Sequence, residues 1–161
     1  MAKIWLCGIT SSGNSHNLRE LIQPVLHCFD GLVWTFHKPQ DEGIDYLESV
    51  KGDGKIIYTD WVGRYDFARN HYLFSNTIKE GDWFFNIDSE ERLSPHFMEN
   101  FEEFAKTFEA NQIDGLYYEG KFLAFKLNEW MFWRNSIHET LEGVQKPIDL
   151  KGAMPFDEQP I

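Results

Sequence analysis

Short apolar runs that alternate with helical patterns limit most strongly the folds open to this chain. Four runs have the length of buried strands and are bounded by polar or small residues: residues 4–9, 32–36, 55–59 and 83–87. Between them, apolar residues recur at helical spacing in three segments, residues 18–25, 43–50 and 66–78. Strands that alternate with helices indicate parallel pairing through crossover helices. We therefore predict an α/β fold in which a mostly parallel central sheet is flanked by helices.

A further helix and a hairpin are expected after the fourth run. Ser94 is a suitable N-cap and Pro95 suits the first turn, so a helix is expected from there to about Ala110. Two apolar segments then flank the sequence Glu119-Gly120-Lys121, which is typical of a small hairpin near the C-terminus. Pro24 lies in the first helical segment and predicts that this helix kinks or ends early.

The length of the chain suits one domain. Its 161 residues are enough to bury a core without disulfides or a structural metal. We expect this domain to cover residues 1–143, followed by an irregular tail over residues 144–161 that contains several prolines. No stretch approaches the roughly 18 apolar residues that span a bilayer, and no signal-peptide pattern opens the sequence. We therefore expect no transmembrane segment and a cytoplasmic location.

The acidic composition excludes some partners. The formal net charge is −11 at pH 7, so we expect no basic surface that would hold nucleic acid through its phosphates. An anionic ligand can still bind such a protein locally when a divalent cation and one or two arginines lie at the site. Cys7 and Cys28 have no metal-ligand spacing and are interpreted as reduced thiols.

Carboxylates gather directly after the fourth run. Ligands of open α/β sheets bind at the carboxyl ends of the strands, and Asp88, Glu90 and Glu91 follow the apolar residues 83–87. Hard oxygen ligands in such a place suit Mg²⁺ or Mn²⁺, which also bind ligand phosphates. A solvated acidic loop that caps the next helix would explain the same residues.

Three segments, in this order along the chain, resemble family 2 glycosyltransferases, whose fold is called GT-A. Residues 81–93 resemble the family's segment in which GDW and an apolar strand precede a D-x-D metal motif, with Glu90 where an aspartate is usual. Residues 61–70 resemble its W, DF and ARN segment, with a shorter spacing before the Arg-Asn pair. Residues 136–141 contain the His-Glu element of a subgroup that includes lipopolysaccharide-core-type and peptide-modifying transferases.

The resemblance implies a Rossmann-like GT-A fold, a nucleoside-diphosphate sugar donor and a divalent metal. Asp88 and Glu90 would hold Mn²⁺ or Mg²⁺, with Asp88 also reaching the donor, and His138 would be a third ligand. Such a metal would bridge the protein to the diphosphate and stabilise the leaving group.

Further donor-binding residues follow from the same resemblance. Arg69 would hold phosphate oxygens in a bidentate fork, and Asn70 would contact a base or sugar edge. Asp60 is either a contact to a uracil-like edge or an ordinary turn acid. The loop after the first run would cradle the base and ribose, although small hydroxyl residues are also common loop formers; its residues are Thr10, Ser11 and Ser12.

We therefore interpret the chain as a metal-dependent glycosyltransferase. It would move a sugar from a nucleoside-diphosphate sugar to a hydroxyl of a glycan, lipid-linked or protein acceptor. An inverting enzyme needs a carboxylate as general base near the acceptor, and Glu139 and Glu91 are both candidates.

Two other functions remain open at this point. A non-catalytic module that binds sugar nucleotides or glycans would explain why little sequence follows the His-Glu element. A metal-dependent phosphotransfer or nucleotidyltransfer enzyme would also use acids at a strand end, but no glycine-rich phosphate loop is present to favour it.

Overall fold

The structure of the protein is a computed structural model. It describes residues 2–10, 15–37, 42–60, 64–88, 90–135, 139–151 and 153–157, and the structural statements below concern these residues. Ser11, Ser12, Trp61 and His138 lie outside them.

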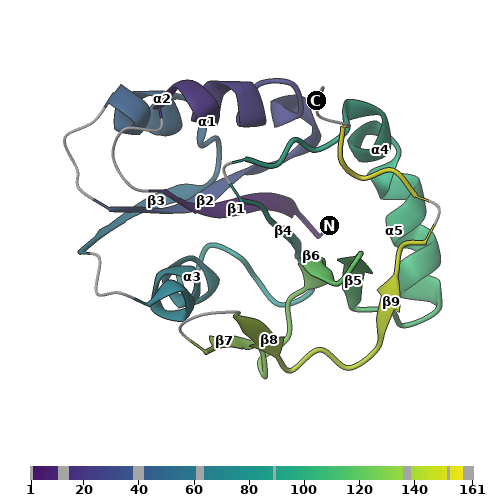
Figure 1. Cartoon of the computed structure of the whole chain (residues 1–161). Coiled ribbons are helices and arrows are strands. Elements are labelled where there is room, and N and C mark those ends of the chain that lie inside the picture. The colour runs from purple at the N-terminus through teal and green to yellow at the C-terminus, as the bar shows by residue number, and fades with distance from the viewer. Residues whose placement is uncertain are drawn as a thin grey trace.

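A seven-stranded sheet forms the centre of the described structure (Figure 1). Its spatial order is β3-β2-β1-β4-β6-β5-β9. Strands β1 to β4 are parallel, β6 runs antiparallel to both β4 and β5, and β9 is parallel to β5. The strands are β1 (Ile4–Thr10), β2 (Gly31–His37), β3 (Lys55–Thr59), β4 (Trp83–Asn86), β5 (Gly115–Tyr118), β6 (Lys121–Lys126) and β9 (Pro147–Asp149). The prediction of an α/β fold with a mostly parallel central sheet is confirmed.

Both faces of the sheet are covered. Figure 1 shows α1 and α2 on one side of the sheet, and α3 with the two-stranded β7–β8 ribbon on the other. Helices α4 and α5 pack on the same face as α1 and α2 and share one hydrophobic core with them. The elements are α1 (Ser15–Ile22), a short 3₁₀ turn η1 (Leu26–Cys28), α2 (Glu42–Val50), α3 (Tyr65–Leu73), α4 (Pro95–Glu99), α5 (Phe101–Ala110), β7 (Phe132–Arg134) and β8 (Thr140–Glu142).

Strand β4 shows how the sequence produces two cores. Successive side chains of a strand point to opposite faces. Trp83 and Phe85 therefore enter the core beneath α4 and α5, and Phe84 enters the core beneath α3. All three side chains are at most 1% exposed. Phe85 meets Phe101 of α5 edge-to-face, with ring centroids 4.8 Å apart. The aromatic residues of β4 thus hold the strand between both layers and fix the position of the acids that follow it.

Two predicted helices differ from the sequence pattern, one by a break and one by an earlier end. The segment after Ser94 forms α4 and α5 rather than one helix, and the break lies at Asn100, whose side-chain amide donates to the His96 carbonyl oxygen at 2.8 Å. This local hydrogen bond competes with helix continuation. The predicted cap is confirmed, since Ser94 Oγ accepts from the Phe97 N–H at 3.3 Å. Helix α3 ends at Leu73 instead of residue 78.

The expected irregular tail contains a strand. Residues 147–149 form β9 at the edge of the sheet, and the Leu150 N–H donates to the Tyr117 carbonyl oxygen at 2.7 Å. The carboxylate of Asp114 accepts from the Lys146 N–H at 2.7 Å, which fixes the entry into β9. Farther on, Phe156 bridges to Leu93 beside α4. The prediction of irregular structure is wrong for 147–149, because three residues gave too short an apolar pattern to recognise. The proposed boundary at residue 143 stays a prediction.

None of the described helices combines the length and the apolar character that a bilayer crossing requires.

Gly54 offers a test of the β2–β3 edge. A Cβ at this position would lie 1.8 Å from the carbonyl oxygen of Leu32, a backbone atom of β2 that cannot move cheaply. We expect Gly54→Ala to lower the free energy of unfolding by about 1–3 kcal/mol or more, measured by urea denaturation. Lys55→Ala, at the exposed neighbouring position, should stay within about 0.5 kcal/mol. Equal stability of the two variants would contradict this arrangement.

Candidate functional site

The acids predicted as a site lie at the carboxyl end of β4. Asp88 follows the strand by two residues, and a tight turn fixes the backbone after it. The Glu91 N–H donates to the Asp88 carbonyl oxygen at 3.0 Å, and Glu91 Oε1 accepts from the Asp88 N–H at 2.7 Å. The Glu91 side chain therefore holds the turn and brings its carboxylate beside that of Asp88.

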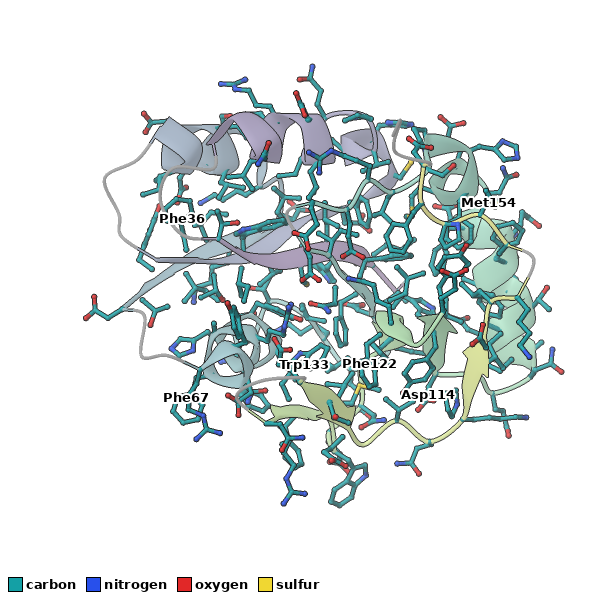
Figure 2. The ribbon with its side chains drawn as sticks, in the orientation of Figure 1. Phe36, Phe67, Asp114, Phe122, Trp133 and Met154 are labelled. Carbon is teal, nitrogen blue, oxygen red and sulfur yellow. The ribbon has the colours of Figure 1, made fainter. Side chains whose placement is uncertain are left out.

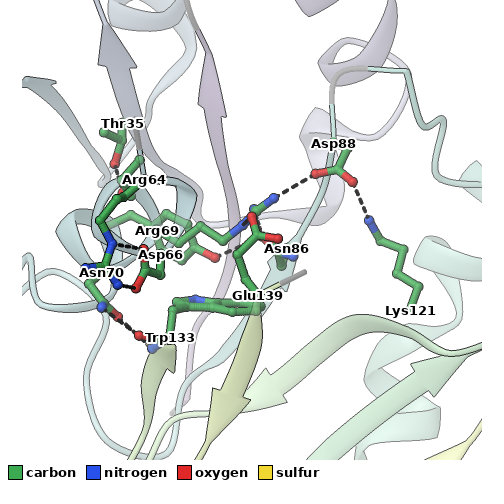
Figure 3. Close-up of polar contacts among 12 residues, drawn as sticks. Thr35, Arg64, Asp66, Arg69, Asn70, Asn86, Asp88, Lys121, Trp133 and Glu139 are labelled. Atoms are coloured by element: carbon green, nitrogen blue, oxygen red, sulfur yellow. Dashed lines mark hydrogen bonds and ion pairs between the residues drawn. The ribbon is translucent and has the colours of Figure 1, made fainter. Parts of the chain in front are cut away.

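Lys121 approaches the same acids from β6. The β5–β6 hairpin turns through Glu119 and Gly120, whose φ angles of 49° and 79° match a two-residue turn of type I′. The antiparallel register pairs Phe85 with Ala124, and three further steps along each strand place Lys121 opposite Asp88. Lys121 Nζ lies 3.4 Å from Asp88 Oδ2 (Figure 3), and it also contacts Glu91 Oε1.

Arg69 of α3 reaches the acids from the face of the sheet that α3 covers. Its side chain is 7% exposed, and each of its three nitrogens donates to a side-chain oxygen (Figure 3). Nε donates to Glu139 Oε1 at 3.0 Å, and Nη2 donates to Asp88 Oδ1 at 2.9 Å. Nη1 donates to Asn86 Oδ1. Arg69 thus joins the end of β4 to the segment before β8. That it binds a donor phosphate stays a prediction.

Buried neighbours hold Arg69 in place. The Tyr72 hydroxyl donates to Asn86 Oδ1 at 2.9 Å, so this oxygen accepts from both Tyr72 and Arg69. The Arg69 guanidinium lies 5.4 Å from the ring centre of Trp133 in β7. Trp133 also meets Phe122 of β6 edge-to-face at 6.0 Å, and both are labelled in Figure 2 between the sheet and the β7–β8 ribbon. The guanidinium is therefore surrounded by rigid side chains.

Asn70 positions β7 through its amide. Its Nδ2 donates to the Trp133 carbonyl oxygen at 3.0 Å, and its Oδ1 accepts from the Trp133 N–H at 2.7 Å. These two bonds mimic a strand pair and attach the β7–β8 ribbon to α3. In this structure the amide contacts the Trp133 backbone, and the expected contact to a base or sugar stays a prediction.

Burial and neighbouring charges shift the pKa of Arg69. Burial alone would lower the pKa of the guanidinium, because it disfavours the charged form. The side chains of Tyr72, Asp88 and Glu139 outweigh burial and raise this pKa above its ordinary value. Arg69 is therefore a permanent positive charge inside the domain.

The pKa values of the two acids that contact Lys121 are shifted in opposite directions. Burial would raise the pKa of Asp88, but Lys121 and Arg69 outweigh it and hold this pKa below its ordinary value. For Glu91, burial is the stronger effect and raises the pKa despite the contact with Lys121. Asp88, which has two cationic partners, is the more firmly ionised carboxylate of the pair.

The metal assignment rests in part on residues outside the described ranges. Glu90 is exposed, and His138 is not described. Among the described residues, no group of three or more His, Cys, Asp or Glu side chains is arranged to hold an ion. The carboxylates of Asp88 and Glu91 do converge on one cation, the Lys121 ammonium. Carboxylate oxygens are the donor type that Mg²⁺ or Mn²⁺ prefers, but these two alone do not make up such a group. Metal binding stays a prediction.

The other predicted donor residues lie on neighbouring strands. Thr10 ends β1 and is 7% exposed, and its Oγ1 accepts from Trp34 Nε1 at 2.8 Å. Asp60 follows β3 and is exposed. Ser11 and Ser12 are not described. The structure thus brings together Asp88, Glu91, Arg69 and Glu139, whereas Thr10 supports the indole of Trp34.

Sequence reasoning missed several residues of the cluster. Lys121 was recognised only as part of a hairpin, although an antiparallel return beside β4 would have placed it opposite Asp88. Asn86 is a polar residue in an otherwise apolar strand, and this signal could have identified it. Tyr72 and Trp133 carry no such signal, because aromatic residues are common in both cores.

Comparisons with known proteins point to glycosyltransferases. No family model matches the chain. The prophage-derived glycosyltransferase SunS of Bacillus subtilis (strain 168) and glycosyltransferase SunS of Bacillus phage SPbeta are each 21% identical to it over 162 residues. Each alignment covers 94% of this chain and 36% of the relative, so the chain spans about a third of their length.

Solved structures share the fold. S. aureus TarS 1–349 superimposes with a TM-score of 0.54 at 18% identity, covering 72% of this chain and 35% of TarS 1–349. TarS 1–349 in complex with UDP gives a TM-score of 0.53 at 17% identity over the same shares. The mixed α/β architecture is therefore similar to that of the TarS glycosyltransferase.

The buried position of Arg69 leads to a stability prediction. Arg69→Met would remove the Arg69 donors to Asp88 Oδ1 and Glu139 Oε1 and one of the two donors to Asn86 Oδ1, and loss of one partner from a buried ion pair costs about 3–5 kcal/mol. We expect a loss of this size in urea denaturation. Arg134→Met is the matched control, because Arg134 is 66% exposed and lies 3.9 Å from Glu142. A loss below about 0.5 kcal/mol in both variants would show that Arg69 does not organise the cluster.

The lowered pKa of Asp88 predicts a contribution to acid unfolding. A carboxyl group with a lowered folded-state pKa adds stability above its unfolded-state pKa of about 3.9, and this stability is lost as the pH falls through the lower folded-state value. The free energy of unfolding should therefore fall less steeply below about pH 5 in Asp88→Asn than in the unaltered protein. Urea midpoints measured across this range check the prediction, and parallel curves would contradict it.

Proposed function

We propose that this chain contains the donor-binding and catalytic region of a glycosyltransferase that uses a nucleoside-diphosphate sugar. The observation that carries the proposal is the cluster of Asp88, Glu91 and Glu139 around two fixed cations at the carboxyl end of β4. Ligands of open α/β sheets bind at this edge. The SunS relatives are glycosyltransferases, and TarS, which shares the fold, has been solved with UDP. Because the chain spans about a third of the SunS length, the activity of a complete relative is part of the proposal.

A divalent ion is the proposed partner of the acids. Asp88 and Glu90, with His138 as a third ligand, would hold Mn²⁺ or Mg²⁺ as the resemblance implies. The ion would neutralise the diphosphate as its charge develops on departure from the sugar. Arg69 would act mainly as a positioning residue, since its nitrogens already hold Asp88 and Glu139.

Two carboxylates are proposed candidates for the general base. Glu139 lies directly before β8 in the β7–β8 ribbon and is held by Arg69 at 3.0 Å. Glu91 lies on the other side of Asp88, and burial raises the pKa of its carboxyl group, which favours proton uptake. Either would remove the proton from the acceptor hydroxyl while the bond to the diphosphate breaks. Membership of family 2, the His-Glu subgroup, the acceptor class and a cytoplasmic location are the finer parts of the proposal.

Calorimetric titration with UDP in the presence of Mn²⁺ tests donor binding. Asp88→Asn and Glu90→Ala should each weaken metal-dependent UDP binding by more than about tenfold, because a charged contact to the ion is lost. Asp53→Asn is the matched control, since its carboxylate is 69% exposed and pairs with Lys3 at the opposite edge of the sheet. Unchanged UDP affinity in Asp88→Asn would remove the central assignment.

Turnover distinguishes an enzyme from a binding module. The unaltered protein incubated with Mn²⁺ should release nucleoside diphosphate from a panel of nucleoside-diphosphate sugars, with water taking the sugar because no acceptor is added. Saturable binding without release would favour the non-catalytic module, and binding of triphosphates alone would favour a phosphotransfer enzyme.

A further inference from the structure

The side-chain amide of Asn86 uses only its oxygen. Asn86 is the last residue of β4 and is 5% exposed. Its Oδ1 accepts from Arg69 Nη1 and from the Tyr72 hydroxyl, the latter at 2.9 Å. Within the part of the chain that the structure describes, its Nδ2 donates to no other residue. An amide nitrogen can donate twice, so two donors of a buried side chain are open to a ligand.

Other asparagines of the protein use their nitrogen in the usual way. In four of them Nδ2 donates to a backbone carbonyl oxygen, at distances of 2.8 to 3.0 Å, although each is less buried than Asn86. These four are Asn70, Asn100, Asn111 and Asn128. Because buried polar groups are normally hydrogen-bonded, the open nitrogen of Asn86 needs an explanation.

The partners of the amide oxygen fix its orientation. A guanidinium can only donate, so the Asn86 atom that faces Arg69 Nη1 must be the oxygen. The Tyr72 hydroxyl, which is fully buried, restrains the same oxygen from a second direction. Turning the amide over would bring Nδ2 against the Arg69 donor and leave both without an acceptor. Nδ2 is therefore held on the side of the amide away from Arg69 and Tyr72.

The Asn86 nitrogen can be reached from outside the core. Among the described residues, the fully enclosed side-chain atoms without a hydrogen-bond partner are the Tyr46 hydroxyl and Trp133 Nε1, and Asn86 Nδ2 is not one of them. Both faces of the sheet are covered by helices or by the β7–β8 ribbon, so the access lies at the carboxyl edge, where β4 ends. Ligands of open α/β sheets bind at this edge.

The same guanidinium holds three groups around the place of the proposed reaction. Arg69 donates to Asn86, Asp88 and Glu139 through its three nitrogens, so these side chains lie close together (Figure 3). In the proposed reaction the diphosphate lies on the Asp88 side, and Glu139 is a candidate base for the attacking hydroxyl. The donor sugar lies between them, because it is bonded to the diphosphate and receives the acceptor. Asn86 is therefore within reach of this sugar.

A fixed and uncharged donor suits a sugar hydroxyl. Phosphate oxygens are bound most strongly by charged donors, whereas an amide N–H pairs well with a neutral oxygen. A buried donor that the ligand leaves unpaired costs free energy, so a site of this kind discriminates against a ligand that lacks the matching group. The Asn86 amide would thus distinguish sugars by the presence of one hydroxyl.

We propose that Asn86 Nδ2 binds a hydroxyl oxygen of the donor sugar and selects donors that carry this hydroxyl. The inference deepens the proposed function and rests on its nucleoside-diphosphate sugar. Asn86 then determines specificity, and Arg69 and Tyr72 are the positioning residues that hold its amide.

Calorimetric titration with modified donors tests this role. UDP-glucose and UDP-N-acetylglucosamine are compared, in the presence of Mn²⁺, with forms of each that lack one sugar hydroxyl. For the unaltered protein, at least one deoxygenated donor should bind about tenfold more weakly than its parent, because one hydrogen bond is lost. In Asn86→Thr the hydroxyl can still accept from Arg69, and a methyl group replaces the nitrogen. This variant should bind the parent and that deoxygenated donor equally.

The comparison has an internal and an external control. Parent and deoxygenated donors carry the same charge, so any general effect of the substitution on diphosphate binding cancels. Asn111→Thr is the matched variant, because Asn111 is an exposed asparagine at the end of α5 whose Nδ2 donates to the Thr107 carbonyl oxygen at 2.8 Å. It should keep the difference between the two donors.

Nuclear magnetic resonance replaces the variant if Asn86→Thr does not fold, as judged by thermal unfolding. The signals of the Asn86 side-chain amide are then followed in the unaltered protein at saturating donor concentrations. They should shift with the parent donor and not with UDP or with the deoxygenated donor that binds weakly.

The outcomes separate this inference from the proposed function. Deoxygenated donors that all bind like their parents, a difference that survives Asn86→Thr, or Asn86 signals that do not respond to the sugar would overturn the role of Asn86 alone. Absence of binding by UDP and by every donor would instead contradict the proposed function, and the inference with it.

Discussion

The buried guanidinium of Arg69 is the interaction on which the site depends. It connects Asp88 at the end of β4, Glu139 before β8 and Asn86 within the sheet, three parts of the chain that are distant in sequence. A charge at this depth is tolerated only when its hydrogen bonds and counter-charges are supplied together. The fold supplies them by packing α3 against the face of the sheet on which Asn86 lies, and by attaching the β7–β8 ribbon to α3 through Asn70.

The cluster contains more acidic than basic side chains and therefore carries a net charge. Three carboxylates, Asp88, Glu91 and Glu139, face two cations, Arg69 and Lys121. The surplus is negative, so the proposed metal ion would be attracted to the cluster whereas a bare diphosphate would be repelled. Once a divalent ion is added, the balance becomes positive and favours an anionic ligand. An acidic protein can in this way bind a negatively charged donor at one place.

The sequence predicted the layered fold well, because alternation of apolar strands and amphipathic helices depends on local patterns that residues such as Leu6, Phe84 and Leu47 obey. It also assigned Asp88, Glu139 and Arg69 to one site, but it did not predict that Arg69 bonds directly to both acids. It did not predict β9, whose three residues pair only through the returning tail, or the role of Lys121, which depends on strand order. Strand order is set by contacts between distant segments, and no local pattern encodes it. Ser11, Ser12 and His138 lie outside the described residues, so their roles stay predictions.

The antiparallel direction of β6 also makes the site sensitive to the length of one turn. Parallel strands bring only their carboxyl ends to this edge, whereas β6 contributes its first residue, immediately after the turn at Glu119 and Gly120. Because side chains alternate along a strand, a change of turn length that shifts β6 by one residue against β4 would send the Lys121 ammonium to the opposite face while the strands could still pair. Homologous chains in which this register is shifted would then keep the architecture but lose the lysine from the cluster. The length of the β5–β6 hairpin can therefore be used to select, from sequence, the relatives that share this form of the site.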